Sequence, residues 1–324
     1  MIKAIFVTRE IPQIGIKMLR DRGYEVDVNP KDAQLSQKKL ISMLKKKPYE
    51  AVITILTDKI DATVFEAGSS VKLFVNYATG YDNIDVIEAK KRGITVANAP
   101  ADLSSEAVAE HTIALILSLA ARIVEADESV RRGKYKGWSP MNYIGTDILG
   151  KTLGLVGAGH IGERVAHYAK GLGMKIIYTD VVRNQKIEQE CGAIYVDSVD
   201  ALLPQADVVS LHVPLLDSTR HLINETRLKL MKPTSFLINT ARGPVIDEQA
   251  LTWSLEARVI AGAALDVFEF EPKLVSGLAK LQNVILTPHI ASASIAARNQ
   301  MAEVAAQNII DFFDGKTPQN IVKS

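Results

Sequence analysis

Three charged side chains in the last third of the chain suit acid–base chemistry on a small anion: Arg242, Glu271 and His289. Each one follows an apolar, strand-like run. An imidazole titrates near neutral pH and transfers protons, a nearby carboxylate favours its protonated form, and a guanidinium binds carboxylates. Taken singly, each also has a structural interpretation: a structural histidine, a solvated turn before proline, and a helix cap or surface ion pair.

A Gly-rich segment in the middle of the chain predicts a dinucleotide-binding loop. It has the form Gly-x-Gly-x-x-Gly, follows a strand-like run and opens a helix-like one. Gly157 permits the tight turn, Gly159 lets the backbone approach a pyrophosphate, and Gly162 lets the helix pack on the sheet. The phosphates then face N–H groups at the positive end of a helix. The alternative interpretation is a Gly-rich turn that binds nothing.

An acidic residue, Asp180, closes the next apolar run, 18 residues after Gly162 (180 − 162). Its carboxylate suits both hydroxyls of an NAD ribose and repels a 2′-phosphate. Arg183 follows closely, so use of NADP stays open beside the favoured NAD. The nucleotide-binding residues predicted in this region are Gly157, Gly159, His160, Ile161, Gly162 and Asp180.

The elements that must position these residues are strands and helices in alternation, which predicts an α/β protein with parallel sheets covered on both faces. A single long helix is expected over 104–131, an irregular segment over 133–150, and a last helix over 294–313 that returns to the first domain. The expected strands are 2–7, 24–28, 51–55, 71–75 and 94–97, then 153–156, 175–179, 193–196, 208–211, 236–239, 261–266 and 284–286.

Composition excludes several classes of function. The chain has 324 residues and a net charge of +1, which gives no electrostatic footprint for nucleic acid or an anionic membrane. One cysteine, Cys191, allows no disulfide within the chain. The longest apolar stretch, 113–121, is too short for a membrane span of about 20 residues, and the N-terminus does not resemble a signal peptide. We therefore expect a cytoplasmic protein with no membrane or metal site.

The three charged segments, together with Thr79-Gly80-Tyr81-Asp82-Asn83-Ile84-Asp85, resemble the D-isomer-specific 2-hydroxyacid dehydrogenases along nearly the whole chain. The resemblance is closest to the glyoxylate/hydroxypyruvate reductase branch. It implies two doubly wound parallel-sheet domains. One is a discontinuous, flavodoxin-like substrate domain of residues 1–99 and 288–324, and the other is a central Rossmann NAD-binding domain of residues 100–287.

The resemblance implies D-specific hydride transfer between NAD(H) and a small 2-keto or 2-hydroxy acid. Arg242 then binds the substrate carboxylate and polarises the carbonyl. His289 gives the carbonyl oxygen its proton, and Glu271 fixes the imidazole. These roles agree with the chemistry of the three groups, because general acid catalysis typically contributes 10²–10⁴-fold to a rate.

Further roles are implied by the same resemblance. Backbone N–H groups at Thr79 and Gly80 bind the substrate carboxylate, and Asp266 bonds the nicotinamide carboxamide. In a homodimer, Trp138 reaches the partner's substrate pocket or else simply packs at the interface. The other residues implied to line the cofactor, each with a local turn role as its alternative, are Val213, Pro214, Thr219, Thr240 and Ala241, with Arg242 and His289.

Two other functions are compatible with these residues. One is an enzyme of the same family with another donor, such as phosphite or a bulkier D-2-hydroxy acid. The other is a non-catalytic NAD sensor like the transcriptional co-repressors that share the fold. In addition, Asp82 and Asn83 are expected to cap the helix that follows them.

Overall fold

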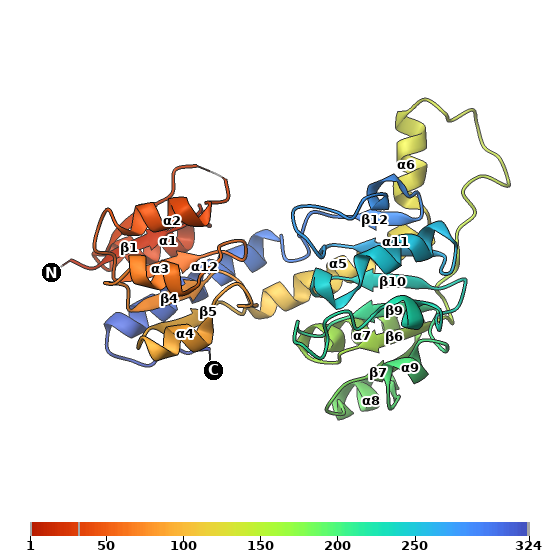
Figure 1. The fold of residues 1–324 in the computed structure, drawn as a ribbon. Helices are drawn as coiled ribbons and strands as arrows, with labels where there is room; N and C mark the ends of the chain where they lie inside the picture. Colours follow the sequence, from red (N-terminus) through yellow and green to blue (C-terminus); the bar gives the residue numbers. More distant parts are fainter. Residues whose placement is uncertain (1, 32, 323–324) are drawn as a thin grey trace. The chain divides into compact units, whose positions relative to one another are not determined.

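The computed structural model describes residues 2–31 and 33–322, and the chain divides into two compact units (Figure 1). Unit 1 comprises Met1–Ser104 and Ala293–Ser324, and unit 2 comprises Ser105–Ser292. Both boundaries lie five residues beyond those expected from the sequence (104 against 99, and 292 against 287). Unit 1 is therefore built from both ends of the chain.

Unit 1 contains a five-stranded parallel sheet in the order β2-β1-β3-β4-β5. This is the flavodoxin-like order expected from the resemblance, which is confirmed. The elements of unit 1 are β1 (Ala4–Val7), α1 (Gln13–Asp21), β2 (Glu25–Val28), α2 (Gln37–Leu44), β3 (Ala51–Thr54), α3 (Ala62–Ala67), β4 (Leu73–Asn76), α4 (Val86–Lys91), β5 (Thr95–Asn98) and α12 (Ile295–Phe313).

Both faces of this sheet are covered, so its three central strands, β1, β3 and β4, are buried along their whole length. Along β1, Ile5 packs with α1 and α12 on one face, and Phe6 packs with α2, α3 and α4 on the other. Helix α12 lies directly against α1, because a Cβ at Gly15 would be 2.5 Å from the carbonyl oxygen of Ala302. The predicted return of the last helix to the first domain is confirmed.

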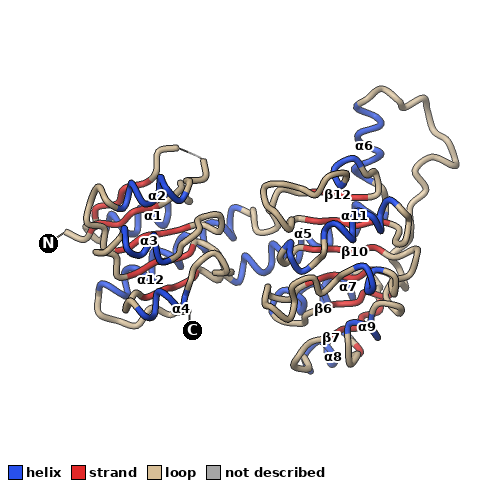
Figure 2. Tube along the Cα trace, in the orientation of Figure 1, coloured by secondary structure: helices blue, strands red, loops and turns tan. Residues whose placement is uncertain are grey.

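Unit 2 contains a seven-stranded parallel sheet in the order β12-β11-β10-β9-β6-β7-β8, a Rossmann sheet with one further strand (Figure 2). Its elements are α5 (Asp102–Ala120, which begins in unit 1), α6 (Ile123–Arg131), β6 (Thr152–Val156), α7 (His160–Gly171), β7 (Lys175–Thr179), α8 (Gln185–Cys191), β8 (Ile194–Tyr195), α9 (Val199–Leu202), β9 (Val208–Leu211), α10 (Glu225–Leu228), β10 (Phe236–Asn239), η1 (Gly243–Val245), α11 (Glu248–Glu256), β11 (Gly262–Leu265), η2 (Leu278–Lys280) and β12 (Val284–Leu286).

Helix α5 is apolar because it belongs to the core of unit 2. Its residues Leu115, Ile116 and Leu119 pack with α7 and α8 on one face of the sheet, while α9, α10 and α11 cover the other. By length and composition α5 could cross a membrane, so the expectation that no segment is long and apolar enough is wrong. The apolar run at 113–121 is only part of this 19-residue helix.

The single helix expected over 104–131 is also wrong, because the chain breaks at Arg122. That residue adopts a left-handed conformation with φ 55° and starts α6 in a new direction. The break is fixed by two interactions: from outside the helix, Thr146 donates its N–H to the carbonyl of Ala120, and within α6 the Arg122 guanidinium pairs with Glu125. None of the residues of α6 is buried, and α6 and the loop after it extend away from the sheet of unit 2 (Figure 1).

Candidate active site

The predicted site residues of unit 2 lie along one edge of its sheet. All its strands are parallel, and the last residues of six of them are paired across the sheet in one continuous row. The members of this row are Thr179, Val156, Leu211, Asn239, Leu265 and Leu286. The segments that begin with Asp180, Gly157, Thr240, Asp266 and Thr287 therefore leave the sheet at the same level.

The Gly-rich loop has the geometry that a pyrophosphate needs. Gly157 has φ 96°, and a Cβ there would meet the carbonyl of His212 at 2.8 Å. Gly162 packs against the carbonyl of Gly157, so a side chain would collide with it. By contrast, a Cβ at Gly159 would meet nothing within 4 Å. The loop therefore presents an open face at the start of α7, where the first N–H groups of a helix have no partner within it.

His212, whose carbonyl lies against Gly157 of this loop, carries no charge at neutral pH. Burial lowers the pKa of His212 to about 4, and its ring is hydrogen-bonded to the hydroxyl of Ser210 at 2.9 Å. His212 therefore adds no positive charge at the Gly-rich loop, where the N-terminus of α7 supplies positive potential for an anion.

Asp180 follows β7 and is held against the same loop. Its carboxylate accepts hydrogen bonds from the N–H groups of Ala158 and Val181, each at 2.6 Å. Arg183, three residues on, is engaged elsewhere: its guanidinium forms a two-pronged pair with Glu188 and lies 5.2 Å from the ring centre of Tyr195. The carboxylate of Asp180 therefore faces the loop, whereas the charge of Arg183 is neutralised by Glu188.

Glu271 and His289 form the pair that the sequence predicted. The Nδ1 atom of His289 lies 2.9 Å from Oε2 of Glu271, and Oε1 accepts the N–H of Phe268 at 3.0 Å. Burial by itself would raise the pKa of Glu271, but the hydrogen bond and charge of His289, the N–H of Phe268 and the charge of Arg242 together lower it. Glu271 is thus a carboxylate at neutral pH and fixes the orientation of the ring.

His289 stands in an uncommon backbone conformation, with φ 55°. The left-handed region costs a non-glycine residue about 1 kcal/mol, so the surroundings must impose it. Asp266 does so. Its fully buried carboxylate accepts the Thr287 hydroxyl at 2.6 Å, the N–H of Ile290 at 2.9 Å and the N–H of Ala291 at 2.7 Å, on both sides of His289.

This arrangement assigns Asp266 a role that the sequence did not reveal. The resemblance implies a hydrogen bond to the nicotinamide carboxamide, which stays a prediction, and the structure adds that both carboxylate oxygens hold the loop of His289. A second buried carboxylate, Glu248, was missed entirely. It accepts the N–H groups of Glu269 and Val275, both at 2.7 Å, and so brackets the turn that carries Glu271. In the sequence it is an ordinary acidic residue in a first helical turn.

Arg242 lies in a turn that packs tightly on the Glu271 segment. Asn239 shapes the turn through hydrogen bonds with Ala241 N–H and Arg242 C=O, both at 3.0 Å. A Cβ on Gly243 would collide with the backbone carbonyl of Phe268. The structure therefore brings the segments of Arg242, Glu271 and His289 together through the backbone.

The remaining predicted cofactor residues have local partners. Thr240 is buried, with its hydroxyl 2.9 Å from that of Thr112 on α5. Thr219 closes the loop after β9 by donating to the carbonyl of Pro214 at 2.6 Å, and Val213 lies at the start of that loop. The hydroxyl of Thr219 thus shapes the loop after β9, and the hydroxyl of Thr240 ties the end of β10 to α5.

Three predicted substrate residues belong to other parts of the chain. Thr79 and Gly80 follow β4 at the corresponding edge of the sheet of unit 1. Trp138 lies in the irregular segment after α6 and is 85% exposed. The expected helix caps at Asp82 and Asn83 are wrong: Asp85 caps α4 by accepting the N–H of Glu88. Among residues 2–31 and 33–322, no cluster of three or more His, Cys, Asp or Glu side chains could hold a metal ion.

Comparison with known proteins decides the family. The model of the NAD-binding domain of D-isomer-specific 2-hydroxyacid dehydrogenases matches residues 113–291. A glyoxylate reductase from Korarchaeum cryptofilum is 48% identical over 320 residues, which cover 98% of this chain and 95% of that protein. The chain belongs to the D-isomer-specific 2-hydroxyacid dehydrogenase family. The resemblance seen in the sequence is confirmed.

Solved structures of 2-hydroxyacid dehydrogenases share the whole fold. A glyoxylate reductase from Paecilomyes thermophila superposes with a TM-score of 0.86 at 31% identity, covering 99% of this chain and 98% of that one. An NADPH-dependent glyoxylate/hydroxypyruvate reductase from Sinorhizobium meliloti gives a TM-score of 0.86 at 28% identity, covering 99% and 96–97% of the two chains. The protein is thus a nicotinamide-dependent D-2-hydroxyacid dehydrogenase.

Proposed function

We propose that this dehydrogenase is an NADH-dependent reductase of small 2-keto acids, with glyoxylate or hydroxypyruvate as substrate and a D-2-hydroxy acid as product where the new centre is chiral. The observation that carries the proposal is the Glu271–His289 pair. The segments that carry these two residues leave the sheet of unit 2 at the same edge as the Gly-rich loop. Relatives with the name glyoxylate reductase support the choice of substrate.

Three side chains have different roles in the proposed reaction. When bound, the nicotinamide supplies the hydride that reaches the carbonyl carbon of the substrate. His289 donates a proton to the carbonyl oxygen as the C–O double bond becomes a single bond. Glu271 stabilises the imidazolium before this transfer, and Arg242 binds the substrate carboxylate and polarises the carbonyl. Asp266 holds the His289 loop and, in this proposal, also accepts a hydrogen bond from the nicotinamide carboxamide.

The test of this mechanism is His289→Gln. The amide keeps a polar group but cannot donate a proton as an acid, so turnover falls by about 10²–10⁴-fold while NADH still binds. Turnover is followed by nicotinamide absorbance, and NADH binding by fluorescence. Turnover within about twofold of the wild type would refute the role of His289 as the acid.

A panel of substrates tests the substrate class with the same assay. Glyoxylate and hydroxypyruvate are compared with bulkier 2-keto acids, and phosphite is tested with NAD⁺ in the oxidative direction. We expect the two small keto acids to have the highest kcat/KM. NADH binding without turnover of any of these compounds would favour a sensor.

For the cofactor, we propose NAD rather than NADP. Asp180 places a carboxylate beside the loop, where it repels a 2′-phosphate, and Glu188 neutralises the nearby Arg183. Asp180→Ala should weaken NADH binding and narrow the preference for NADH over NADPH. Arg183→Ala is the matched control and should leave NADPH affinity unchanged. An unchanged preference in Asp180→Ala would overturn the assignment.

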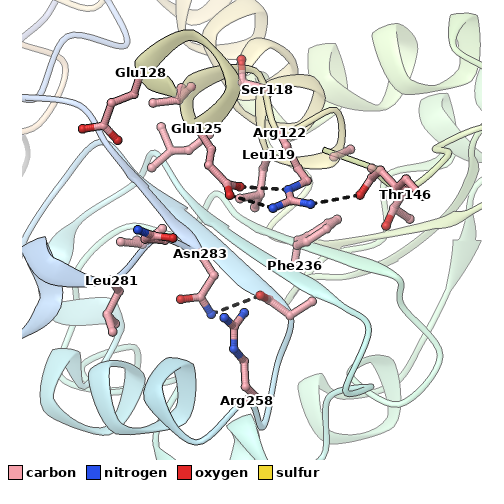
Figure 3. A pocket seen from close by; sticks show the side chains of 18 of the residues that line it. Ser118, Leu119, Arg122, Glu125, Glu128, Thr146, Phe236, Arg258, Leu281 and Asn283 are labelled. Carbon is pink, nitrogen blue, oxygen red and sulfur yellow. Dashed lines mark hydrogen bonds and ion pairs between the residues drawn. The ribbon is translucent and has the colours of Figure 1, made fainter. Parts of the chain in front are cut away.

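We further propose a homodimer built by residues 123–149, named here the arm. The arm exposes large apolar side chains that include Trp138 (85%), Leu149 (76%) and Met141 (74%). At its base lies a cavity of about 580 Å³, lined by residues of α5, α6 and β12, with Arg122 and Glu125 paired at its wall (Figure 3). An apolar surface of this kind favours a protein partner, and a second copy can supply matching arms.

Sedimentation of the purified protein tests this assembly. The wild type should sediment as a dimer, and a Trp138→Ser, Met141→Ser double variant should shift toward monomer. A monomeric wild type would exclude the homodimer. We also propose a cytoplasmic protein that binds neither membrane nor nucleic acid, supported by its net charge of +1.

A further inference from the structure

The Thr79–Gly80 turn of unit 1 is held by two asparagine side chains. Asn98, the last residue of β5, donates its amide N–H to the carbonyl of Thr79 at 2.7 Å. Asn76, the last residue of β4, donates to the carbonyl of Gly80 at 2.8 Å. Two successive carbonyls of one turn are therefore fixed by donors that the sheet itself positions.

Asn76 is a rigid support because its amide is fully used. It is completely buried, and its Oδ1 accepts the hydroxyl of Thr54 at 2.9 Å. Its Nδ2 also donates to Oδ1 of Asn83 at 2.9 Å, and Asn83 in turn donates to the carbonyls of Ile55 and Asp58. This network ties the turn to the loop after β3.

The direction of these carbonyls sets the direction of the N–H groups. In a trans peptide the C=O of one residue and the N–H of the next point in opposite directions. With the carbonyls of Thr79 and Gly80 directed at Asn98 and Asn76, the N–H groups of Gly80 and Tyr81 point away from both asparagines. Within the part of the chain that the structure describes, neither N–H donates to an acceptor. Successive free N–H groups form a concavity that binds anions.

We propose that Asn76 and Asn98 are positioning residues that aim the N–H groups of Gly80 and Tyr81 at the carboxylate of the substrate. This inference rests on the proposed function, because it takes the anion to be the carboxylate of a 2-keto acid. It adds Tyr81 N–H to the predicted contacts at Thr79 and Gly80, and it explains why this turn presents donors. The two asparagines touch no reacting atom.

The test is Asn98→Ala, which removes one support without touching the buried amide of Asn76. Without this hydrogen bond the turn no longer aims its N–H groups correctly at the substrate carboxylate. The contact with the carboxylate is present in both the ground state and the transition state, so KM rises while kcat is kept. We expect KM for glyoxylate to rise about tenfold, the size of one lost hydrogen bond to a charged group, with kcat and KM for NADH within about twofold. Asn76→Ser should act in the same direction.

Asn29→Ala is the matched control. Asn29 also lies just after a strand of unit 1, where its amide donates to the carbonyls of Thr8 and Lys31. Its loss should lower thermal stability as much as Asn98→Ala does but leave KM for glyoxylate unchanged. A similar KM in Asn98→Ala and wild type would overturn the proposal, as would a fall in kcat at constant KM.

Calorimetry with oxamate and saturating NADH separates this proposal from the proposed function, since it needs no turnover. If the wild type binds oxamate but reduces no 2-keto acid, the proposed function fails. A loss of oxamate affinity in Asn98→Ala then still supports the positioning role. A wild type that binds no oxamate, or equal affinity in the two proteins, would overturn it.

Discussion

Glu248 and Glu269 are joined by a reciprocal pair of hydrogen bonds, in which the backbone N–H of each donates to the carboxylate of the other, at 3.1 and 2.7 Å. The second oxygen of Glu248 accepts Val275 N–H, and the second oxygen of Glu269 lies 2.7 Å from Nε2 of His221. The turn that carries Glu271 is thus anchored at both ends to the start of α11.

Glu248→Gln tests this anchor. Glutamine keeps the volume but turns an NH₂ group toward one of the two N–H donors, so a buried donor loses its acceptor at a cost of about 1–3 kcal/mol. We expect the free energy of unfolding in urea to fall by that amount and kcat/KM for glyoxylate to fall about tenfold. Glu256→Gln, at the exposed end of the same helix, should change neither quantity. Wild-type behaviour of Glu248→Gln would remove Glu248 from the account of the site.

Gly243→Ala tests the contact between the Arg242 turn and the Glu271 segment. The added methyl would collide with the carbonyl of Phe268, and overpacking of this kind typically costs about 1–3 kcal/mol. Activity should fall with stability, because both backbones that meet there carry predicted catalytic groups. Gly171→Ala, at the end of α7 with nothing within 4 Å of its new Cβ, should be neutral or stabilising. Equal melting temperatures for the two variants would contradict the described packing.

Glu271→Gln should change the pH profile of the reaction. The pKa of Glu271 is lowered, so in the wild type Glu271 is charged throughout the neutral range, 2.9 Å from the ring of His289. Without that charge the proton to be transferred is less well stabilised at the site, so the alkaline limb of kcat/KM for glyoxylate reduction should move to lower pH. A profile that only scales down, with its limb in place, would show that Glu271 acts through geometry alone.

Asp58→Asn should change how stability depends on pH. Asp58 is buried, its Oδ1 has no hydrogen-bond partner, and burial raises its pKa above the usual value. A raised folded-state pKa gives stability that is present at low pH and is lost as pH rises through it. The free energy of unfolding of the variant relative to wild type should therefore increase from about pH 4 to about pH 7, measured by urea denaturation. A difference that does not vary with pH would show that the Asp58 pKa is the same in both states.

The sequence predicted the fold well, because both sheets are parallel and buried. Their strands are short apolar runs whose ends are marked by glycine and polar residues, and the strands at 208–211 and 236–239 were located to the residue. The pair of Glu271 and His289 was predictable from residue type and position after a strand. That the Gly-rich loop and the Arg242 turn lie at the same edge was also predictable, because the carboxyl ends of all strands in a parallel sheet share one edge.

Other features depend on contacts that a linear sequence does not encode. The break at Arg122 depends on Thr146, which returns to the end of α5 from 24 positions away (146 − 122). The supporting roles of Asp266 and Glu248 depend on the direction of backbone N–H groups in loops, which have no periodicity. For the same reason, nothing in the sequence marks Asn76 and Asn98, at the ends of two strands, as supports of the Thr79–Gly80 turn.

The packing of α12 against α1 has a consequence for biosynthesis. Gly15 meets Ala302, so the core of unit 1 joins one segment made before unit 2 with another made after it. When its first hundred residues have been made, α1 covers only part of one face of their sheet, whereas the whole sheet of unit 2 is already complete when α12 appears. The nucleotide-binding half should therefore mature during synthesis, while the other half waits for α12 and needs protection from aggregation until then.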